Sequence, residues 1–141
     1  MAITFEYQKA DYRLADEDAV RRWIGRVVKS RGCRVGSIGY LFCSDDYLLE
    51  ANIKYLSHDT YTDIITFDYV EGNIVSGDMM ISVDRVEENA AKFSVSAEHE
   101  LRRVIIHGVL HLLGQGDKSE EDAREMRRQE EEALRLWQTA E

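Results

Sequence analysis

The sequence predicts an α+β fold in which a mixed four-stranded sheet packs with four to five helices in a single domain, residues 1–141. Short segments with alternating apolar side chains, typical of strands, are interspersed with segments whose apolar residues recur at helical spacing. One helical segment, residues 104–113, is apolar on nearly every side, which indicates a helix buried against the sheet. A chain of 141 residues is long enough to form one hydrophobic core.

The predicted elements alternate along the chain. Apolar alternation predicts strands over residues 3–7, 34–43, 63–70 and 77–83. Helical spacing predicts helices over residues 14–30, 44–55, 84–93, 96–113 and 120–137. Ser96 can cap the fourth helix, and Ser119 with Asp122 resembles a capping box for the last one. Gly114 and Gly116 end the buried helix, so a short loop follows it.

Composition excludes several classes of protein. A net charge of -9 argues against a protein that coats nucleic acid through bulk attraction. No apolar run approaches the ~20 residues of a membrane helix, and the start of the chain lacks the basic and apolar regions of a secretory signal, which indicates the cytoplasm. Cys33 and Cys43 share no metal-type spacing, so we expect small buried thiols.

The strongest local signal is a pair of histidines in the buried helix. His107 and His111 are one helical turn apart, so both rings project from one face at a separation that one metal ion can bridge. The alternative is a pair that bonds only to backbone and carboxylates, but burying two imidazoles together without a metal is costly. The loop after the helix can return Asp117 as a third ligand, although Asp117 could instead help to cap the last helix. Three such ligands leave a fourth position for water, as in catalytic zinc sites, and mixed nitrogen and oxygen ligation does not exclude nickel, manganese or iron.

The residue after the first histidine indicates which kind of bond the protein hydrolyses. In the common zinc-peptidase motif this residue is a Glu that acts as general base, whereas here it is Gly108, which counts against peptide hydrolysis. A metal could instead generate hydroxide and neutralise charge on a phosphoryl oxygen. Arg22, Arg26 and Lys29 share one face of the first helix and could follow a phosphate backbone, although a solvated helix face is the plainer interpretation.

Several segments together resemble a known family. Residues 107–114, His-Gly-Val-Leu-His-Leu-Leu-Gly, followed by a third ligand, resemble the bacterial YbeY family of metal-dependent endoribonucleases, also called rRNA maturation factors. The segments Asn52-x-x-Tyr55, 62–67 (Thr-Asp-Ile-Ile-Thr-Phe) and 77–79 (Gly-Asp-Met) are similar to the family's motifs in the same order, and Met126 fits as well. The resemblance covers residues 50–130.

The resemblance implies a cytoplasmic, single-strand-specific endoribonuclease in 16S rRNA 3′ end maturation and ribosome quality control. It implies one zinc ion bound by His107, His111 and Asp117, with metal-activated water as the expected nucleophile; scission by an RNA 2′-hydroxyl stays open. The implied partners are single-stranded RNA, rRNA and the ribosome or its small subunit, with no membrane, and the oligomeric state is left open.

The sequence departs from the family pattern at two positions. Family members commonly carry a third histidine where Asp117 stands, and a carboxylate can take its place. They commonly carry an arginine, suited to phosphate contact, where Leu56 stands; Lys54, His58 or the basic first helix could supply the missing cation. This second departure supports an alternative function, a ribosome-associated binding factor with a structural metal and little nuclease activity.

Three further titratable residues have less specific expectations. Asp63 and Asp78 are expected near the site, either as acceptors that orient a ligand histidine or as caps of local turns. His99, in the first turn of its helix, is expected to be solvated.

Overall fold

Four strands form one open sheet, in a computed structural model that describes residues 2–140 and the side chains of residues 2–137. The strands are β1 (Ala2–Tyr7), β2 (Arg34–Cys43), β3 (Ile64–Asp68) and β4 (Ile74–Ser82), in the order β1-β2-β4-β3. β2 pairs in parallel with both β1 and β4, whereas β3 pairs antiparallel with β4 at one edge. This mixed sheet confirms the predicted fold class.

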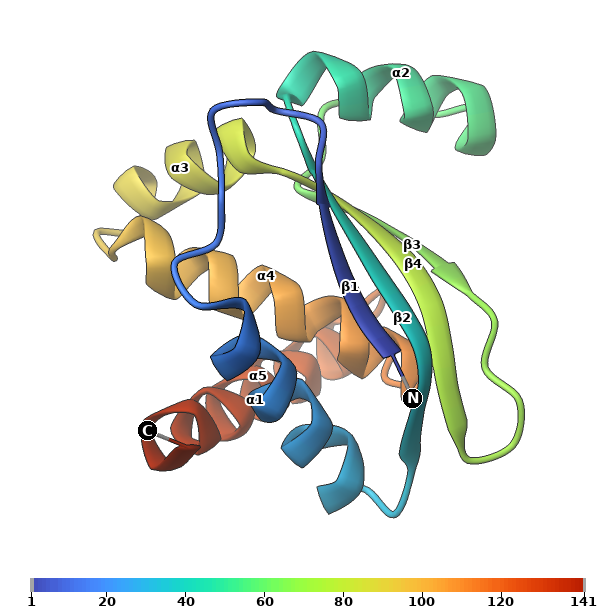
Figure 1. Ribbon diagram of the computed structural model, residues 1–141. Helices are drawn as coiled ribbons and strands as arrows, with labels where there is room; N and C mark the ends of the chain where they lie inside the picture. Colours follow the sequence, from blue (N-terminus) through green and yellow to red (C-terminus); the bar gives the residue numbers. More distant parts are fainter. Residues whose placement is uncertain (1, 141) are drawn as a thin grey trace.

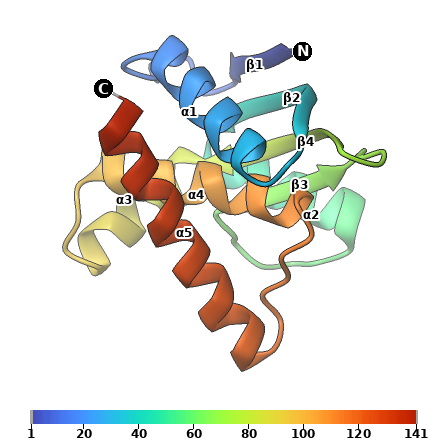
Figure 2. The ribbon, with the colours of Figure 1, turned by 90° about the horizontal axis from the view of Figure 1, so that it is seen from below.

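Five helices accompany the sheet: α1 (Glu17–Ser30), α2 (Asp45–Leu56), α3 (Val83–Lys92), α4 (Ala97–Leu112) and α5 (Glu120–Ala140). Figure 1 shows α1, α4 and α5 together on one side of the sheet and α2 on the other side. Seen from below, α5 crosses α4 and runs on towards α1 (Figure 2), and α5 contacts both helices. The helix α4 is therefore enclosed between the sheet and α5, as its apolar sequence predicts.

The backbone of α4 comes unusually close to the sheet. A Cβ atom on Gly108 would lie 2.3 Å from Sδ of the buried Met79 in β4. Likewise, a Cβ atom on Gly77 of β4 would lie 2.9 Å from a δ carbon of Leu112 in α4. Both distances are below van der Waals contact, so glycine at these positions lets the helix and the strand approach each other.

Some boundaries differ from the predicted ones. α1 begins at Glu17 rather than at residue 14, because Oδ1 of Asp16 accepts a hydrogen bond from the amide of Ala19 and caps the helix there. β4 begins at Ile74 rather than at residue 77, because Ile74 already pairs with Arg34 of β2. Tertiary pairing thus extends this strand beyond the segment in which its sequence alternates.

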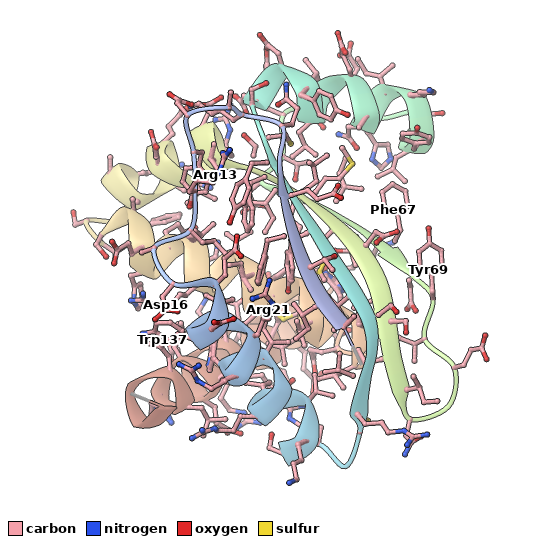
Figure 3. All side chains as sticks on the ribbon, in the orientation of Figure 1. Arg13, Asp16, Arg21, Phe67, Tyr69 and Trp137 are labelled. Atoms are coloured by element: carbon pink, nitrogen blue, oxygen red, sulfur yellow. The ribbon has the colours of Figure 1, made fainter. Side chains whose placement is uncertain are left out.

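Two predicted caps are present. Oγ of Ser96 accepts from the amide of His99 at the start of α4, and Oγ of Ser119 accepts from the amide of Asp122 at the start of α5. Among the described residues, no helix combines the length and the apolar character that crossing a bilayer requires. On the sheet face opposite α4, Phe67 and Tyr69 lie on the side of α2 (Figure 3), and the ring of Phe67 packs edge-on against Tyr55 of α2, with ring centroids 5.9 Å apart.

Candidate metal centre

Two imidazoles and one carboxylate meet at the C-terminal end of α4. Nε2 of His107 lies 3.3 Å from Oδ2 of Asp117, and Nε2 of His111 lies 3.5 Å from the same oxygen. One ligand atom from each of the three residues lies within 4.8 Å of the other two. The structure therefore brings together the three residues that the sequence singles out as candidate ligands.

The loop between α4 and α5 returns Asp117 to the histidines. Gly114 has a φ of +98°, a conformation that favours glycine, and it turns the chain out of α4. The amide of Gln115 donates to the carbonyl of Leu110 at 3.0 Å, and the side-chain amide of Gln129 in α5 donates to Oε1 of Gln115 at 2.9 Å. Because these bonds hold the loop to both helices, Asp117 has a defined place.

The sequence also allows Asp117 to act as a cap of the last helix. Ser119 caps α5 through its hydroxyl, so the capping position is already filled. The side chain of Asp117 is 36% exposed and faces the histidines instead.

The geometry of the group fits a divalent metal ion. With metal–ligand bonds of about 2.1 Å, neighbouring ligand atoms of a tetrahedral site lie roughly 3.4 Å apart. The distances from Asp117 to His107 and to His111 are 3.3 and 3.5 Å, in agreement with this spacing. Neutral imidazole nitrogens and a carboxylate oxygen are all electron-pair donors, so their convergence favours a cation between them.

A buried carboxylate fixes one of the two rings. Nδ1 of His107 lies 2.6 Å from Oε2 of Glu130 in α5, and Glu130 is 4% exposed. With Nδ1–H donating to this carboxylate, the lone pair of Nε2 is directed to Asp117. Carboxylates in this position commonly orient metal-binding histidines and raise their basicity.

An arginine forms an ion pair with that carboxylate. Arg103 forms a two-pronged ion pair with Glu100, at 2.9 and 2.7 Å, and it also lies 3.3 Å from Glu130. Glu100 is only 2% exposed, and buried carboxylates are costly unless a cation or hydrogen bonds compensate their charge. Arg103 thus stabilises both carboxylates, and through Glu130 it supports the orientation of His107.

Asp63 joins the same network from the start of β3. Its carboxylate lies 3.6 Å from Arg103, and its backbone carbonyl accepts from the amide of Ser82. Burial raises the pKa of the Asp63 carboxyl, while the charge of Arg103 opposes this rise. Asp63 thus lines the cleft and pairs with Arg103, and among the described residues it makes no hydrogen bond to a histidine.

The structure does not bring Asp78 to the histidines. Gly77 and Met79, its neighbours in β4, contact α4, and successive side chains of a strand point to opposite faces. Asp78 is exposed on the face away from the histidines, so it cannot orient either of them. Its place in the middle of β4 also excludes the alternative of a turn cap.

The predicted RNA-binding cations are not among the described residues that line the cleft at the three ligands. Arg22, Arg26 and Lys29 are exposed on α1, which packs against β2 and α5, whereas the cleft borders β3 at the sheet edge. Lys54 lies on α2, and His58 is exposed in the loop that follows. RNA contact by these five residues stays a prediction.

Leu56, by contrast, does line the cleft, together with Thr62, Thr66 and Asp68. The position at which the family commonly carries an arginine therefore faces the candidate metal centre. In this chain it presents an apolar side chain that is 42% exposed.

Sequence reasoning missed the carboxylate behind His107. Its signal lies in α5, where the buried residues Met126, Gln129, Glu130 and Ala133 recur at helical spacing. Two polar side chains thus interrupt an apolar helix face, and a buried carboxylate requires a partner. The sequence does not show which residue is that partner, because the pair joins α5 to α4 over 23 residues.

The fold and the site define a class: small α+β proteins in which a buried helix and the following loop present an open His-His-Asp group that could hold a metal ion. The sequence model of the family described as Endoribonuclease YbeY matches residues 3–138, and the chain belongs to this family. The resemblance seen in the motifs is thereby confirmed.

Named relatives match over most of their length. The chain is 47% identical over 135 residues to Endoribonuclease YbeY of Flavobacterium johnsoniae, covering 96% of each chain. It is 54% identical over 114 residues to Endoribonuclease YbeY of Phocaeicola vulgatus, covering 81% of this chain and 83% of that protein. The solution structure of TM1509 from Thermotoga maritima aligns with a TM-score of 0.66 at 27% identity, covering 98% of this chain and 93% of that one.

Proposed function

We propose that this protein is a zinc-dependent endoribonuclease that cleaves single-stranded RNA, and that residues 1–141 act as one domain. Its relatives are named Endoribonuclease YbeY, which supports RNA as the substrate class. The observation that carries the proposal is the convergence of His107, His111 and Asp117 in an open cleft. We further propose that it acts in the cytoplasm, in 16S rRNA 3′ end maturation and ribosome quality control, with the ribosome or its small subunit as partner.

The side chains of the site have different roles. His107, His111 and Asp117 would hold the metal, while Glu130 accepts a hydrogen bond from Nδ1–H of His107 and keeps Nε2 available. When bound, a divalent metal supplies an activated water and neutralises charge on a phosphoryl oxygen. The side chain of His111 is 34% exposed, so the cleft leaves an open side for an RNA strand.

Gly108 also agrees with this assignment. It lies on the helix face that packs against Met79, where a side chain would collide with the sheet. A general base at this position, as in the common zinc-peptidase motif, has no room here. The geometry at Gly108 therefore counts against peptide hydrolysis by that motif.

The proposal is tested by comparing the cleavage activity of metal-free and zinc-loaded protein. The substrates are a labelled single-stranded RNA, an RNA duplex and a peptide. We expect cleavage of the single strand by the zinc-loaded protein alone. His111→Ala should lose bound zinc and cleavage, whereas His99→Ala, an exposed histidine of the same helix, should keep both. If His111→Ala leaves metal content and RNA cleavage unchanged, the proposal fails.

One observation supports a second candidate, a ribosome-associated binding factor with a structural metal and little nuclease activity. Leu56 faces the cleft where a cation would contact phosphate. This candidate requires that zinc-loaded wild type leaves RNA intact and that His111→Ala still co-sediments with the small ribosomal subunit. Robust cleavage by wild type would exclude it.

A further inference from the structure

The cleft at the candidate metal centre is acidic. Asp63, Asp68 and Asp117 line it, Glu130 contacts His107, and Glu100 pairs with Arg103. Arg103 offsets part of this charge, but its guanidinium is already engaged with three carboxylates. An RNA strand adds a negative charge at every phosphate, so its binding here requires a cation that is free to meet it.

Lys118 is such a cation. Among the described residues that line the cleft it is the single lysine or arginine. Its side chain is exposed, and within the described part of the chain it forms no hydrogen bond or ion pair. Its ammonium group is therefore available to a ligand.

The place of Lys118 follows from the loop that holds Asp117. Consecutive Cα atoms are about 3.8 Å apart, so Lys118 begins next to a candidate metal ligand. The bond between Gln115 and Gln129 ties this loop to α5 and keeps both residues at the cleft. Leu56 also lines the cleft, and its side chain offers no charge.

We propose that Lys118 binds the phosphate backbone of the RNA substrate at the metal cleft and supplies the cation that position 56 lacks. This inference rests on the proposed function. Lys118 acts on substrate binding and is not a ligand of the metal, so its effect is measurable when no metal is present.

Fluorescence anisotropy tests the proposal. Metal-free protein is titrated into a fluorescent single-stranded RNA in the presence of a chelator, at several salt concentrations. We expect Lys118→Gln to weaken binding about three- to tenfold and to reduce the slope of log affinity against log salt by about 0.7, the value for one phosphate contact on a single strand. Lys118→Arg should retain wild-type affinity. Lys92→Gln, an exposed lysine of α3 outside the cleft, is the matched control and should not change binding.

A second measurement uses zinc-loaded protein. Lys118→Gln should keep its bound zinc while kcat/KM on single-stranded RNA falls by the same factor as the affinity. If metal-free Lys118→Gln binds RNA with the wild-type affinity and the wild-type salt dependence, the role of Lys118 is excluded even when wild type cleaves RNA. If zinc-loaded wild type does not cleave RNA at all, the proposed function fails, and the metal-free titration still decides whether Lys118 contacts RNA.

Discussion

Nδ1 of His107 lies 2.6 Å from Oε2 of Glu130, and this contact joins α4 to α5. A neutral imidazole has one N–H, so donating it to the carboxylate leaves Nε2 as the atom that faces Asp117. The ring orientation of one candidate metal ligand is therefore set by a residue that the metal itself would not touch.

Removing the charge of Glu130 is expected to weaken metal binding. Glu130→Gln keeps the size of the side chain but loses the carboxylate, and changes of such outer partners typically cost roughly 10–100-fold in metal affinity. Zinc affinity, measured by competition with a chromophoric chelator, checks this. Glu131→Gln, its exposed neighbour, should bind zinc like wild type, and equal affinities for all three proteins would contradict the prediction.

The third ligand position should accept a histidine but not an alanine. Asp117→Ala removes one of the three donors and should lower zinc affinity more than the roughly 10–100-fold of an outer partner. Asp117→His restores a donor of the type that the family commonly carries there, so it should keep stoichiometric zinc. The zinc content of the purified variants checks this prediction. Zinc retained by Asp117→Ala would exclude Asp117 as a ligand.

Adding one methyl group at Gly108 should destabilise the protein. The new Cβ would lie 2.3 Å from Sδ of Met79 and 2.9 Å from Cδ1 of Ile64, and overpacking of this kind costs about 1–3 kcal/mol. Urea denaturation gives the free energy of unfolding.

A second glycine of the chain provides the control for that variant. Gly25 lies in α1, and a Cβ atom added there would have nothing within 4 Å, so Gly25→Ala should raise the free energy of unfolding by up to about 1 kcal/mol. If both variants shift the free energy of unfolding in the same direction, the close approach of α4 to the sheet does not control stability.

The ion pair of Asp84 should make stability pH-dependent. A hydrogen bond from Lys9 at 2.7 Å and another from the amide of Asp45 lower the pKa of Asp84 below its ordinary value of 3.8. The folded state therefore binds this proton less readily than the unfolded state, so the stabilisation is present above pH 3.8 and is lost as the pH falls through the folded pKa. Asp84 is 37% exposed, so solvent screening keeps the effect small.

Comparing wild type with Asp84→Asn measures that effect. The difference in their free energies of unfolding should be larger at about pH 6 than at about pH 3, and added salt should reduce it. A difference that is the same at both pH values would show that the charge of Asp84 does not contribute.

Several features were predictable because their causes are local. The histidine spacing in α4, the capping hydroxyls of Ser96 and Ser119, and the turn at Gly114 all depend on residues within one or two helical turns. The start of β4 at Ile74 was not predictable, because it depends on pairing with Arg34, far away in the sequence. The sheet face on which Asp78 lies is not predictable for a similar reason, because packing decides which side of a strand meets α4.

Helical periodicity and a short glycine-bounded loop are enough to predict the α+β class and a candidate metal group of His107, His111 and Asp117. The contact of Glu130 with His107, and the place of Lys118 in the same cleft as Leu56, follow only from the folded chain. These relationships depend on how α5 crosses α4 and how β3 forms the sheet edge. Contacts between elements distant in sequence arise from shared burial, and no local pattern encodes which residues will meet.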